Sequence, residues 1–429
     1  MEGADATSHE ALLISNGASR IKAFAVVCLA LTWAWPAELH AQVAEAEVRA
    51  TTFIEPSPTS KLLVLNPAVT LGVLPADWLK INAQYQADIV SGATEAIKGG
   101  RLSSVDVVSS ATDFNDVRHL VSGGFSLLRE TTELTAAYSY GTEKDYRSQS
   151  FAITAGTTFL QKNTELNLSY ARGFDSVCTS NYAESDAPSA RTALDSSTGC
   201  FTNAEDRAER DVNLDNFQAG WTQTWTPIFA TQVVLTGALQ NGFLENPYRS
   251  VVIAPAGDLA LENHPDNRAR GAVAVRGRIF VKPIDTAFGL GVRVYRDTWD
   301  VVGQTYELEA ERYMFSWLRA LVRARYYTQG EALFWSDDYT GGEPIAGPRG
   351  QYWSGDRELS PLTSYLLGLR LLVSKEGRPD ERIAGMFLGF SASAGLDLMK
   401  TTLDDFTWGG TDPDDTAALI GSLGIKAEF

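Results

Sequence analysis

The feature of this sequence that most constrains its fold is a two-residue alternation, which is clearest in residues 415–429. From Ala417 to Phe429 every second residue is apolar or glycine, and Lys426 and Glu428 are among the residues between them. Side chains of a β-strand point alternately to its two faces, so this period predicts a strand with one apolar face. Phe429 ends the stretch in register with that face.

The same alternation recurs along most of the chain. In residues 79–89, apolar positions such as Ile81 and Tyr85 alternate with polar ones such as Lys80 and Gln84. A run of roughly ten such residues matches a tilted strand that crosses a membrane. The sequence therefore predicts an all-β protein, a transmembrane antiparallel up-and-down β-barrel of about 14 strands. An even number places both barrel ends of the chain on the periplasmic side. The expected strands are 77–90, 118–128, 132–140, 147–159, 164–172, 212–225, 231–241, 268–281, 285–298, 304–315, 318–335, 360–373, 383–399 and 415–429.

The lengths of the connections support this topology. Short connections at Arg129–Thr131, Leu160–Asn163, Thr226–Ala230 and Lys282–Ile284 fall at alternate positions. Bacterial barrels have short periplasmic turns and longer external loops, so the other connections are expected to lie outside the cell. The long connections are 91–117, 173–211, 242–267, 336–359 and 400–414.

The N-terminal region carries an export pattern. Arg20 and Lys22 precede an apolar run, residues 23–35, which has the length of a signal-peptide core and is too short to span a bilayer as a helix. With cleavage after Leu39-His40-Ala41, residues 1–41 are expected to be a leader and signal peptide. No later stretch is apolar for long enough to form a transmembrane helix, so a membrane location requires a barrel.

The rest of the chain divides in two. Residues 42–76 show little periodicity and contain Pro56, Pro58, Pro67 and Pro75, which predicts a periplasmic arm or a plug segment. Residues 77–429 are expected to form the barrel with its external loops. A final strand that ends on Phe429 resembles the C-terminal assembly signal of bacterial outer-membrane barrels. This resemblance implies the barrel assembly machinery as a partner, and the final strand is expected to pair with the strand near 79–89.

Cysteine usage fits the same topology. Cys28 lies in the signal segment, which leaves Cys178 and Cys200 in the longest external loop. An exported loop is in an oxidising place, so a disulfide between these two residues is predicted. Metal binding by two free thiols is the weaker alternative, because neither has a nearby histidine or a Cys-x-x-Cys partner.

Composition restricts the function. A formal net charge of −17 argues against a nucleic-acid partner. Beyond the signal segment only His119 and His264 remain, and no glycine-rich phosphate loop is present, so no catalytic residue, metal or cofactor is expected and the chain is not expected to be an enzyme. A hydrolase would have to combine His119 with Ser109 or Ser110, or His264 with Asp266.

Charged residues fall on the face of several strands that should line the lumen, because arginines that face lipid at the bilayer midplane cost about 2–4 kcal/mol each. One interpretation is a structural ladder of ion pairs that fills the interior. The other is a selectivity surface for charged solutes. The predicted lumen-lining residues are Arg270, Arg276, Arg278, Arg293, Asp297, Glu307, Glu309, Glu311, Arg319, Arg323, Arg325 and Arg370.

Three short motifs lie near expected external strand ends. Asp88-Ile-Val-Ser-Gly-Ala-Thr94 is repeated as Asp106-Val-Val-Ser-Ser-Ala-Thr112, and Asn246-Pro247-Tyr248-Arg249 follows later. Their side chains are expected to fix loops through hydrogen bonds to the backbone. Presentation of oxygens to a cation is the alternative. The residues concerned are Asp88, Ser91, Thr94, Asp106, Ser109, Thr112, Asn246 and Arg249.

With its SGAT and NPYR elements followed by C-terminal barrel strands, the chain resembles an uncharacterised domain-of-unknown-function family of Gram-negative outer-membrane proteins. The resemblance covers most of the exported chain and implies an outer-membrane β-barrel in contact with lipid and lipopolysaccharide. It brings no known substrate or catalytic residue.

Three functions are consistent with these observations. The first is a channel or porin-like conduit for small polar or charged solutes, with a lumen lined by Arg and Glu. The second is a plugged structural or accessory barrel that serves as a scaffold for a partner. The third is a hydrophobic conduit that resembles the outer-membrane fatty-acid transporters, because Asn66-Pro67-Ala68 is similar to part of their plug. A charged lumen argues against this function, since a lipid conduit needs an apolar cavity.

Overall fold

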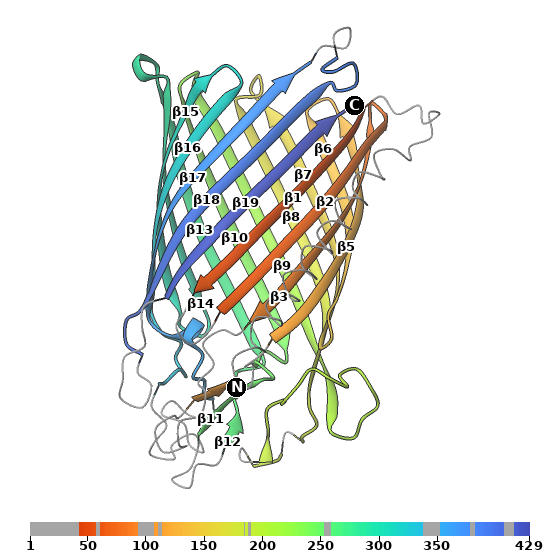
Figure 1. The fold of residues 1–429 in the computed structure, drawn as a ribbon, viewed down its shortest axis with the longest axis vertical. Coiled ribbons are helices and arrows are strands. Elements are labelled where there is room, and N and C mark those ends of the chain that lie inside the picture. The colour runs from red at the N-terminus through yellow and green to blue at the C-terminus, as the bar shows by residue number, and fades with distance from the viewer. Residues whose placement is uncertain are drawn as a thin grey trace, which may run out of the picture. The chain divides into compact units, whose positions relative to one another are not determined.

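The computed structural model shows a closed antiparallel β-barrel whose strands follow one another around the wall in sequence order (Figure 1). It describes residues 43–56, 61–92, 107–109, 114–183, 185–187, 190–252, 259–337, 352–377, 382–406 and 416–429. The wall strands are β1 (Val43–Pro56), β2 (Lys61–Ala76), β3 (Leu79–Gly92), β5 (Phe114–Arg129), β6 (Thr132–Thr142), β7 (Tyr146–Phe159), β8 (Thr164–Ser180), β9 (Arg207–Thr226), β10 (Phe229–Gly242), β13 (Asn267–Val281), β14 (Thr286–Asp297), β15 (Val302–Phe315), β16 (Leu318–Gln329), β17 (Leu362–Glu376), β18 (Gly389–Leu403) and β19 (Thr416–Glu428).

The barrel has 16 strands, which corrects the expected number of about 14. The two additional strands are β1 and β2, which occupy the segment expected to be an arm or plug. Apolar residues on both faces of β2, such as Val64 and Leu65, hide the two-residue period. Pro67 cannot donate a ladder hydrogen bond, and the β2–β3 pairing is interrupted at Asn66 and Pro67 while its register continues from Ala68.

The barrel closes between β19 and β1, which corrects the expected pairing of the final strand with residues 79–89. The Phe429 N–H donates to the Ala44 carbonyl oxygen at 2.8 Å, and the Phe429 ring lies 5.3 Å from the ring of Phe387. On the inner side of the seam, Glu45 forms ion pairs with Lys80 at 2.5 Å and Lys426 at 3.2 Å. The seam is therefore polar inside, and its ion pairs span four strands, β19, β1, β2 and β3.

The two rims of the barrel differ. The start of β1, the end of β19 and short turns such as 130–131 and 316–317 lie at one end, here called the turn rim (Figure 1). The longer connections meet at the other end, here called the loop rim. A small sheet at the loop rim contains β4 (Val107–Ser109), β11 (Arg249–Val252) and β12 (Leu259–Leu261). This separation matches the predicted alternation of short and long connections.

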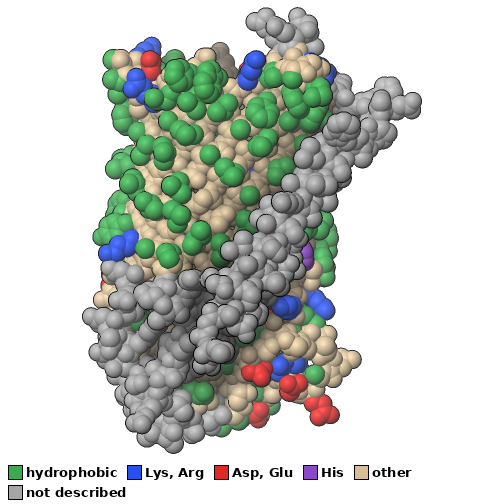
Figure 2. All heavy atoms as spheres, viewed as in Figure 1, with side chains coloured by type: hydrophobic (Ala, Val, Ile, Leu, Met, Phe, Trp, Pro, Cys, Tyr) green, Lys and Arg blue, Asp and Glu red, His purple; other side chains and the backbone are tan. Residues whose placement is uncertain are grey.

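The outer face of the wall is apolar (Figure 2). Leu290 on β14, Leu308 on β15 and Leu367 on β17 are 56%, 59% and 58% exposed, as expected for side chains that contact lipid rather than water. No helix within the described ranges has the length and hydrophobicity needed to cross a bilayer. Exposed aromatic residues form a belt at the turn rim, at the level where such rings meet the membrane interface. They are Trp78, Phe159, Trp225, Phe229, Phe315 and Trp317.

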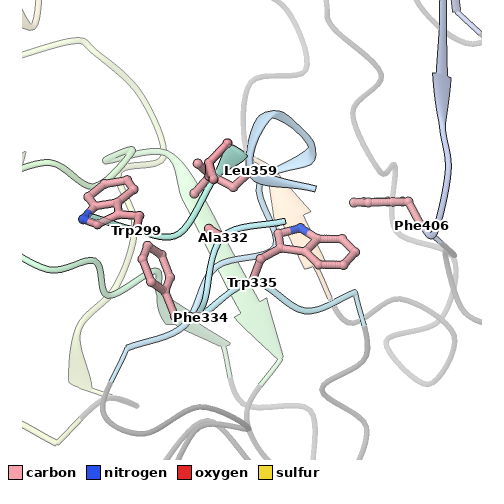
Figure 3. Packing of buried hydrophobic residues seen from close by; sticks show 7 residues of the cluster. Trp299, Ala332, Phe334, Trp335, Leu359 and Phe406 are labelled. Atoms are coloured by element: carbon pink, nitrogen blue, oxygen red, sulfur yellow. The ribbon is translucent and has the colours of Figure 1, made fainter. Parts of the chain in front are cut away.

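A hydrophobic core lies among the connections at the loop rim (Figure 3). The rings of Trp299 and Phe334 meet edge to face at 5.1 Å, and Trp335 packs against Phe406 at 5.8 Å. These residues come from three separate connections, 298–301, 330–361 and 404–415. We call the described parts of these connections, with residues 243–266, the loop cap. The cluster residues are Trp299, Val301, Ala332, Phe334, Trp335, Leu359 and Phe406.

Candidate functional site

The strand register determines which side chains face the lumen. Leu290 is paired with Leu308, and Ala324 with Leu367, so the exposed leucines share the outer face. The intervening positions on these strands point inward, because side chains alternate along a strand. All of the predicted lumen-lining residues occupy inward positions: Arg270, Arg276, Arg278, Arg293, Asp297, Glu307, Glu309, Glu311, Arg319, Arg323, Arg325 and Arg370.

Glutamates of β15 form ion pairs with arginines of the strands around them. Glu307 lies 2.7 Å from Arg276 of β13, across the inward glycine Gly291 of β14. Glu311 pairs with Arg278 on one side and, at 3.0 Å, with Arg319 on the other. These bridges form the inner ladder that the sequence predicts.

Asp397 is a lumenal carboxylate that the sequence reasoning missed. It pairs with Arg323 at 2.6 Å, and its strand, β18, has an otherwise small and uncharged inner face near this position. The alternation of Leu396, Asp397 and Leu398 could have placed it inward. Asp297 also has a partner that was not predicted, Arg268 at the start of β13.

The inner face of β13–β18 is richer in arginine than in carboxylate, and we call it the arginine wall. Leaving aside Glu376 at the turn rim, five carboxylates share this face with nine arginines. The carboxylates are Asp297, Glu307, Glu309, Glu311 and Asp397; the arginines are Arg268, Arg270, Arg276, Arg278, Arg293, Arg319, Arg323, Arg325 and Arg370. The wall therefore carries an excess of positive charge.

Two of these arginines line a lumenal pocket without a carboxylate partner. Arg270 and Arg293 lie with Tyr295 in a pocket of about 360 Å³. Neither arginine forms an ion pair within the described part of the chain, and the Nε of Arg270 is buried without a hydrogen-bond partner there. The pocket is also lined by neutral residues, which include Asn216 and Thr236.

The wall opposite the arginines is mostly uncharged. Its inward side chains bond to one another across neighbouring strands: the Ser126 and Thr135 hydroxyls lie 2.7 Å apart, and the Gln232 side-chain amide donates to the Thr222 hydroxyl at 3.2 Å. Thr154 and Ser169 are also hydrogen-bonded. The lumen is thus electrostatically asymmetric, with guanidinium groups on one side and hydroxyl and amide groups on the other.

The motifs expected to fix loops come together at the loop rim. Strand β4, from the second motif, pairs with β11, which begins in the NPYR motif, so that Ser109 lies opposite Arg249. The Arg249 guanidinium contacts Asp356 of the loop cap at 2.5 Å. Burial alone would lower the pKa of Arg249, but the carboxylates of Glu262 and Asp356 hold that pKa above its usual value.

The remaining motif residues have separate positions. Asn246 accepts a hydrogen bond from the Tyr248 backbone N–H at 2.9 Å, a local turn contact of the expected kind. Asp88 accepts from the side-chain amide of Asn66 on β2, so it ties wall strands together rather than fixing a loop. Ser91 lies in β3. Thr94, Asp106 and Thr112 lie outside the described residues.

Neither histidine has the serine neighbour that a hydrolase would need within the described residues. His119 faces outward and shares a hydrogen bond of 2.9 Å with the Tyr85 hydroxyl. His264 is buried in the loop cap, where its Nε2 lies 3.4 Å from Glu262 rather than beside Asp266. Glu262 also accepts hydrogen bonds from Ser354 and Gly355. These placements give both histidines structural neighbours.

Cys178 and Cys200 form a disulfide, with their Cα atoms 5.7 Å apart. The bond links the end of β8 to the connection that returns to β9. This is the pairing predicted from the sequence.

Three carboxylates meet where β5 and the β6–β7 turn reach the loop rim. One oxygen each from Asp116, Glu143 and Asp145 lie within 4.8 Å of one another. Burial, together with the charges of Asp145 and Asp116, raises the pKa of Glu143 to about 7. Glu143 and Asp145 also line a pocket of about 530 Å³ between the barrel wall and the loop cap. The sequence reasoning missed this group because Asp116 is far from the other two along the chain.

These features define a class of protein: a transmembrane β-barrel with a charged, asymmetric lumen and a folded cap of loops at one rim. The chain belongs to the DUF3570 family of proteins of unknown function, whose model matches residues 23–378. This match confirms the predicted resemblance to an uncharacterised family. None of the curated proteins matches the sequence.

Solved structures with a similar fold include several outer-membrane barrels. A bacterial polysaccharide outer membrane secretin is 12% identical, with a TM-score of 0.47, over 91% of this chain and 100% of its own. The siderophore receptor PirA from Acinetobacter baumannii is 11% identical, with a TM-score of 0.43, over 89% of this chain and 59% of its own. Pseudomonas aeruginosa OccK1 (OpdK) is 6% identical, with a TM-score of 0.39, over 90% of this chain and 98% of its own. At these values the similarities carry no argument about function.

Proposed function

We propose that this protein is an outer-membrane conduit for small polar or charged solutes, and that its arginine wall favours anions. The observation that carries the proposal is the lumenal pocket with Arg270 and Arg293, which have no carboxylate partner among the described residues. A guanidinium group presents several fixed N–H donors to a carboxylate or phosphate. An anion that enters this pocket would supply the missing partner.

The remaining charges of the wall serve a different purpose in this proposal. Arg276, Arg278, Arg319 and Arg323 are already neutralised by carboxylates, so they hold the wall together and contribute less to solute binding. The structural ladder and the selectivity surface are then neighbouring parts of one wall. The charged lumen also argues against a conduit for fatty acids, which needs an apolar cavity.

Planar-bilayer recordings of the purified protein test this function. In a KCl gradient, we expect single-channel steps and a reversal potential that indicates preference for chloride. Replacing Arg270 and Arg293 by Gln should reduce that preference several-fold, because one unit charge at about 4 Å in water is worth roughly 1 kcal/mol. Arg296→Gln is the matched control, since Arg296 lies on β14 near Arg293 but its outward side chain is 73% exposed.

Two results would contradict the proposal. The first is a wild-type reversal potential that the double substitution leaves unchanged, which would show that these arginines do not select ions. The second is the absence of single-channel steps. That result would favour a closed structural or accessory barrel that serves as a scaffold, for which the packed aromatic core of the loop cap is the supporting observation.

The same proposal includes the surroundings of the protein. We infer that the apolar outer wall contacts outer-membrane lipid, with lipopolysaccharide around the loop rim, after export directed by the N-terminal signal. Phe429, at the end of the closing strand, is the residue that we propose the barrel assembly machinery recognises. Catalysis forms no part of the proposal.

A further inference from the structure

Three carboxylates from two parts of the chain converge at the loop rim, and we call them the mouth triad. Asp116 lies near the start of β5, while Glu143 and Asp145 belong to the turn between β6 and β7. One carboxylate oxygen from each residue lies within 4.8 Å of the other two. Like charges at this separation repel one another strongly where water is scarce.

Burial makes the arrangement more costly. Asp116 is only 2% exposed and Asp145 is 7% exposed. Oδ1 of Asp116 accepts the backbone N–H of Val117 at 2.7 Å, but Oδ2 has no hydrogen-bond partner within the described residues. A buried carboxylate oxygen without a partner loses its hydration and regains nothing from the protein. This unpartnered oxygen therefore indicates a missing ligand.

Arg118 is a basic residue close to the triad, but no ion pair joins it to a triad carboxylate within the described residues. The positive charge of Arg118 favours the ionised form of Glu143. Its guanidinium, however, contacts the Ser148 hydroxyl at 3.5 Å and lies 5.7 Å from the ring centre of Tyr146. Asp145 receives hydrogen bonds from the Tyr248 hydroxyl and from its own backbone N–H. The positive charge of Lys144, in the same turn, favours the ionised form of Asp145.

We propose that Asp116, Glu143 and Asp145 bind a calcium ion at the mouth of the barrel. Carboxylate oxygens are the preferred ligands of hard divalent cations, and Ca²⁺ accepts the irregular geometry of groups drawn from a strand and a turn. Mg²⁺ requires near-octahedral geometry and gives up its water reluctantly, so it fits this site less well.

The bound ion would connect the barrel wall to the loop cap. Asp145 is held by the Tyr248 hydroxyl of the NPYR motif, and its carbonyl oxygen accepts the Cys178 N–H at 2.8 Å. An ion that fixes Asp145 to Asp116 would therefore fix β5, the β6–β7 turn and the NPYR segment in one arrangement. This role gives the NPYR element a purpose beyond the local turn contact of Asn246.

Calcium binding to the full-length protein, solubilised in detergent and stripped with EDTA, tests the proposal. Equilibrium dialysis with ⁴⁵Ca²⁺ should show a saturable site whose affinity falls at least about ten-fold in Asp116→Asn and in Glu143→Gln. Asp211→Asn is the control, because it removes the same charge from an exposed residue at the same rim. Ca²⁺ should also raise the thermal midpoint of the wild type and of the control more than that of the two triad variants.

The outcomes are decisive in both directions. If both triad variants bind calcium as tightly as the wild type, the ion sits on other acidic loops and the proposal is overturned. It is also overturned if Mg²⁺ competes as well as Ca²⁺, because the geometric argument for calcium would then be wrong. Two variants are used so that misfolding of one, detected by the mobility of the unheated protein on a gel, does not decide the result.

Discussion

His264 is the histidine whose surroundings are most constrained. Its ring packs against Trp299 and Phe334 at 5.3 Å each, and its Nδ1 lies 3.1 Å from the Leu244 carbonyl oxygen. Complete burial would lower the pKa of the imidazole, but the carboxylates of Glu262, Glu245 and Asp356 raise that pKa above its usual value. The protonated ring is thus a cation held inside the loop cap by carboxylates from three segments.

This arrangement predicts a pH-dependent stability of the loop cap. Because the folded pKa lies above the unfolded value of about 6.5, the stabilisation is fully present below that pH and is lost as the pH rises through the folded pKa. Each pKa unit of difference is worth about 1.4 kcal/mol. The thermal midpoint of the wild type should be lower at pH 9 than at pH 6, and the difference should be smaller for His264→Gln. Equal decreases in the two proteins would show that His264 does not cause the dependence.

For single residues, the sequence predicts whether a side chain faces the lumen or the lipid better than it predicts which residue forms an ion pair with it. Alternation alone places Arg276, Glu307 and Arg323 inside the barrel, because parity along a strand is a local property. Which charges meet depends on the register between strands, so the pairing of Arg323 on β16 with Asp397 on β18 does not follow from the pattern of either strand alone. The mouth triad is harder still to predict, since Asp116 and Glu143 meet only after two strands have paired.

Among the strands, β1 and β2 show the limit of periodicity as a signal. The strand β3 was predicted because polar and apolar residues alternate strictly along it. In β2 the lumenal face includes apolar residues such as Val64 and Ala68 as well as polar Asn66 and Thr70, so the alternation is weak although the strand forms. The pairing of β1 with both β2 and β19 supplies what the local pattern does not show.

Adjacent substitutions in β1 test its place in the wall. Ala50 is paired with Leu423 of β19 on the outer face, and Thr51 is paired with Ser422 on the inner face. Ala50→Arg should destabilise the barrel by about 2–4 kcal/mol, because it places a charge in lipid near the midplane. Thr51→Arg should cost less, since its side chain points into the polar lumen. Urea unfolding in lipid vesicles measures the difference. Equal effects would contradict the assignment of β1 as a wall strand.

The whole molecule combines two structures that are stabilised differently. The barrel depends on its closed hydrogen-bond ladder and on lipid, whereas the loop cap has an aromatic core of its own. The barrel could be predicted because the same period recurs in strand after strand. The cap could not, because Trp299, Phe334 and Phe406 lie in connections without periodicity and meet only when the barrel brings those connections to one rim.

The independence of the two structures predicts that the cap can unpack while the barrel remains folded. Phe334 is 3% exposed and contacts both His264 and Trp299, so Phe334→Ala should destabilise the cap by about 3–5 kcal/mol. Limited proteolysis should then cut within 330–361, while the unheated protein keeps the gel mobility of a folded barrel. Phe315→Ala is the control, because Phe315 is 59% exposed on the lipid-facing belt. A Phe334→Ala variant as resistant as the control would show that the cap does not depend on this core. Loss of the folded mobility in that variant would show instead that cap and barrel unfold together, because the loops would then be part of what keeps the strands closed.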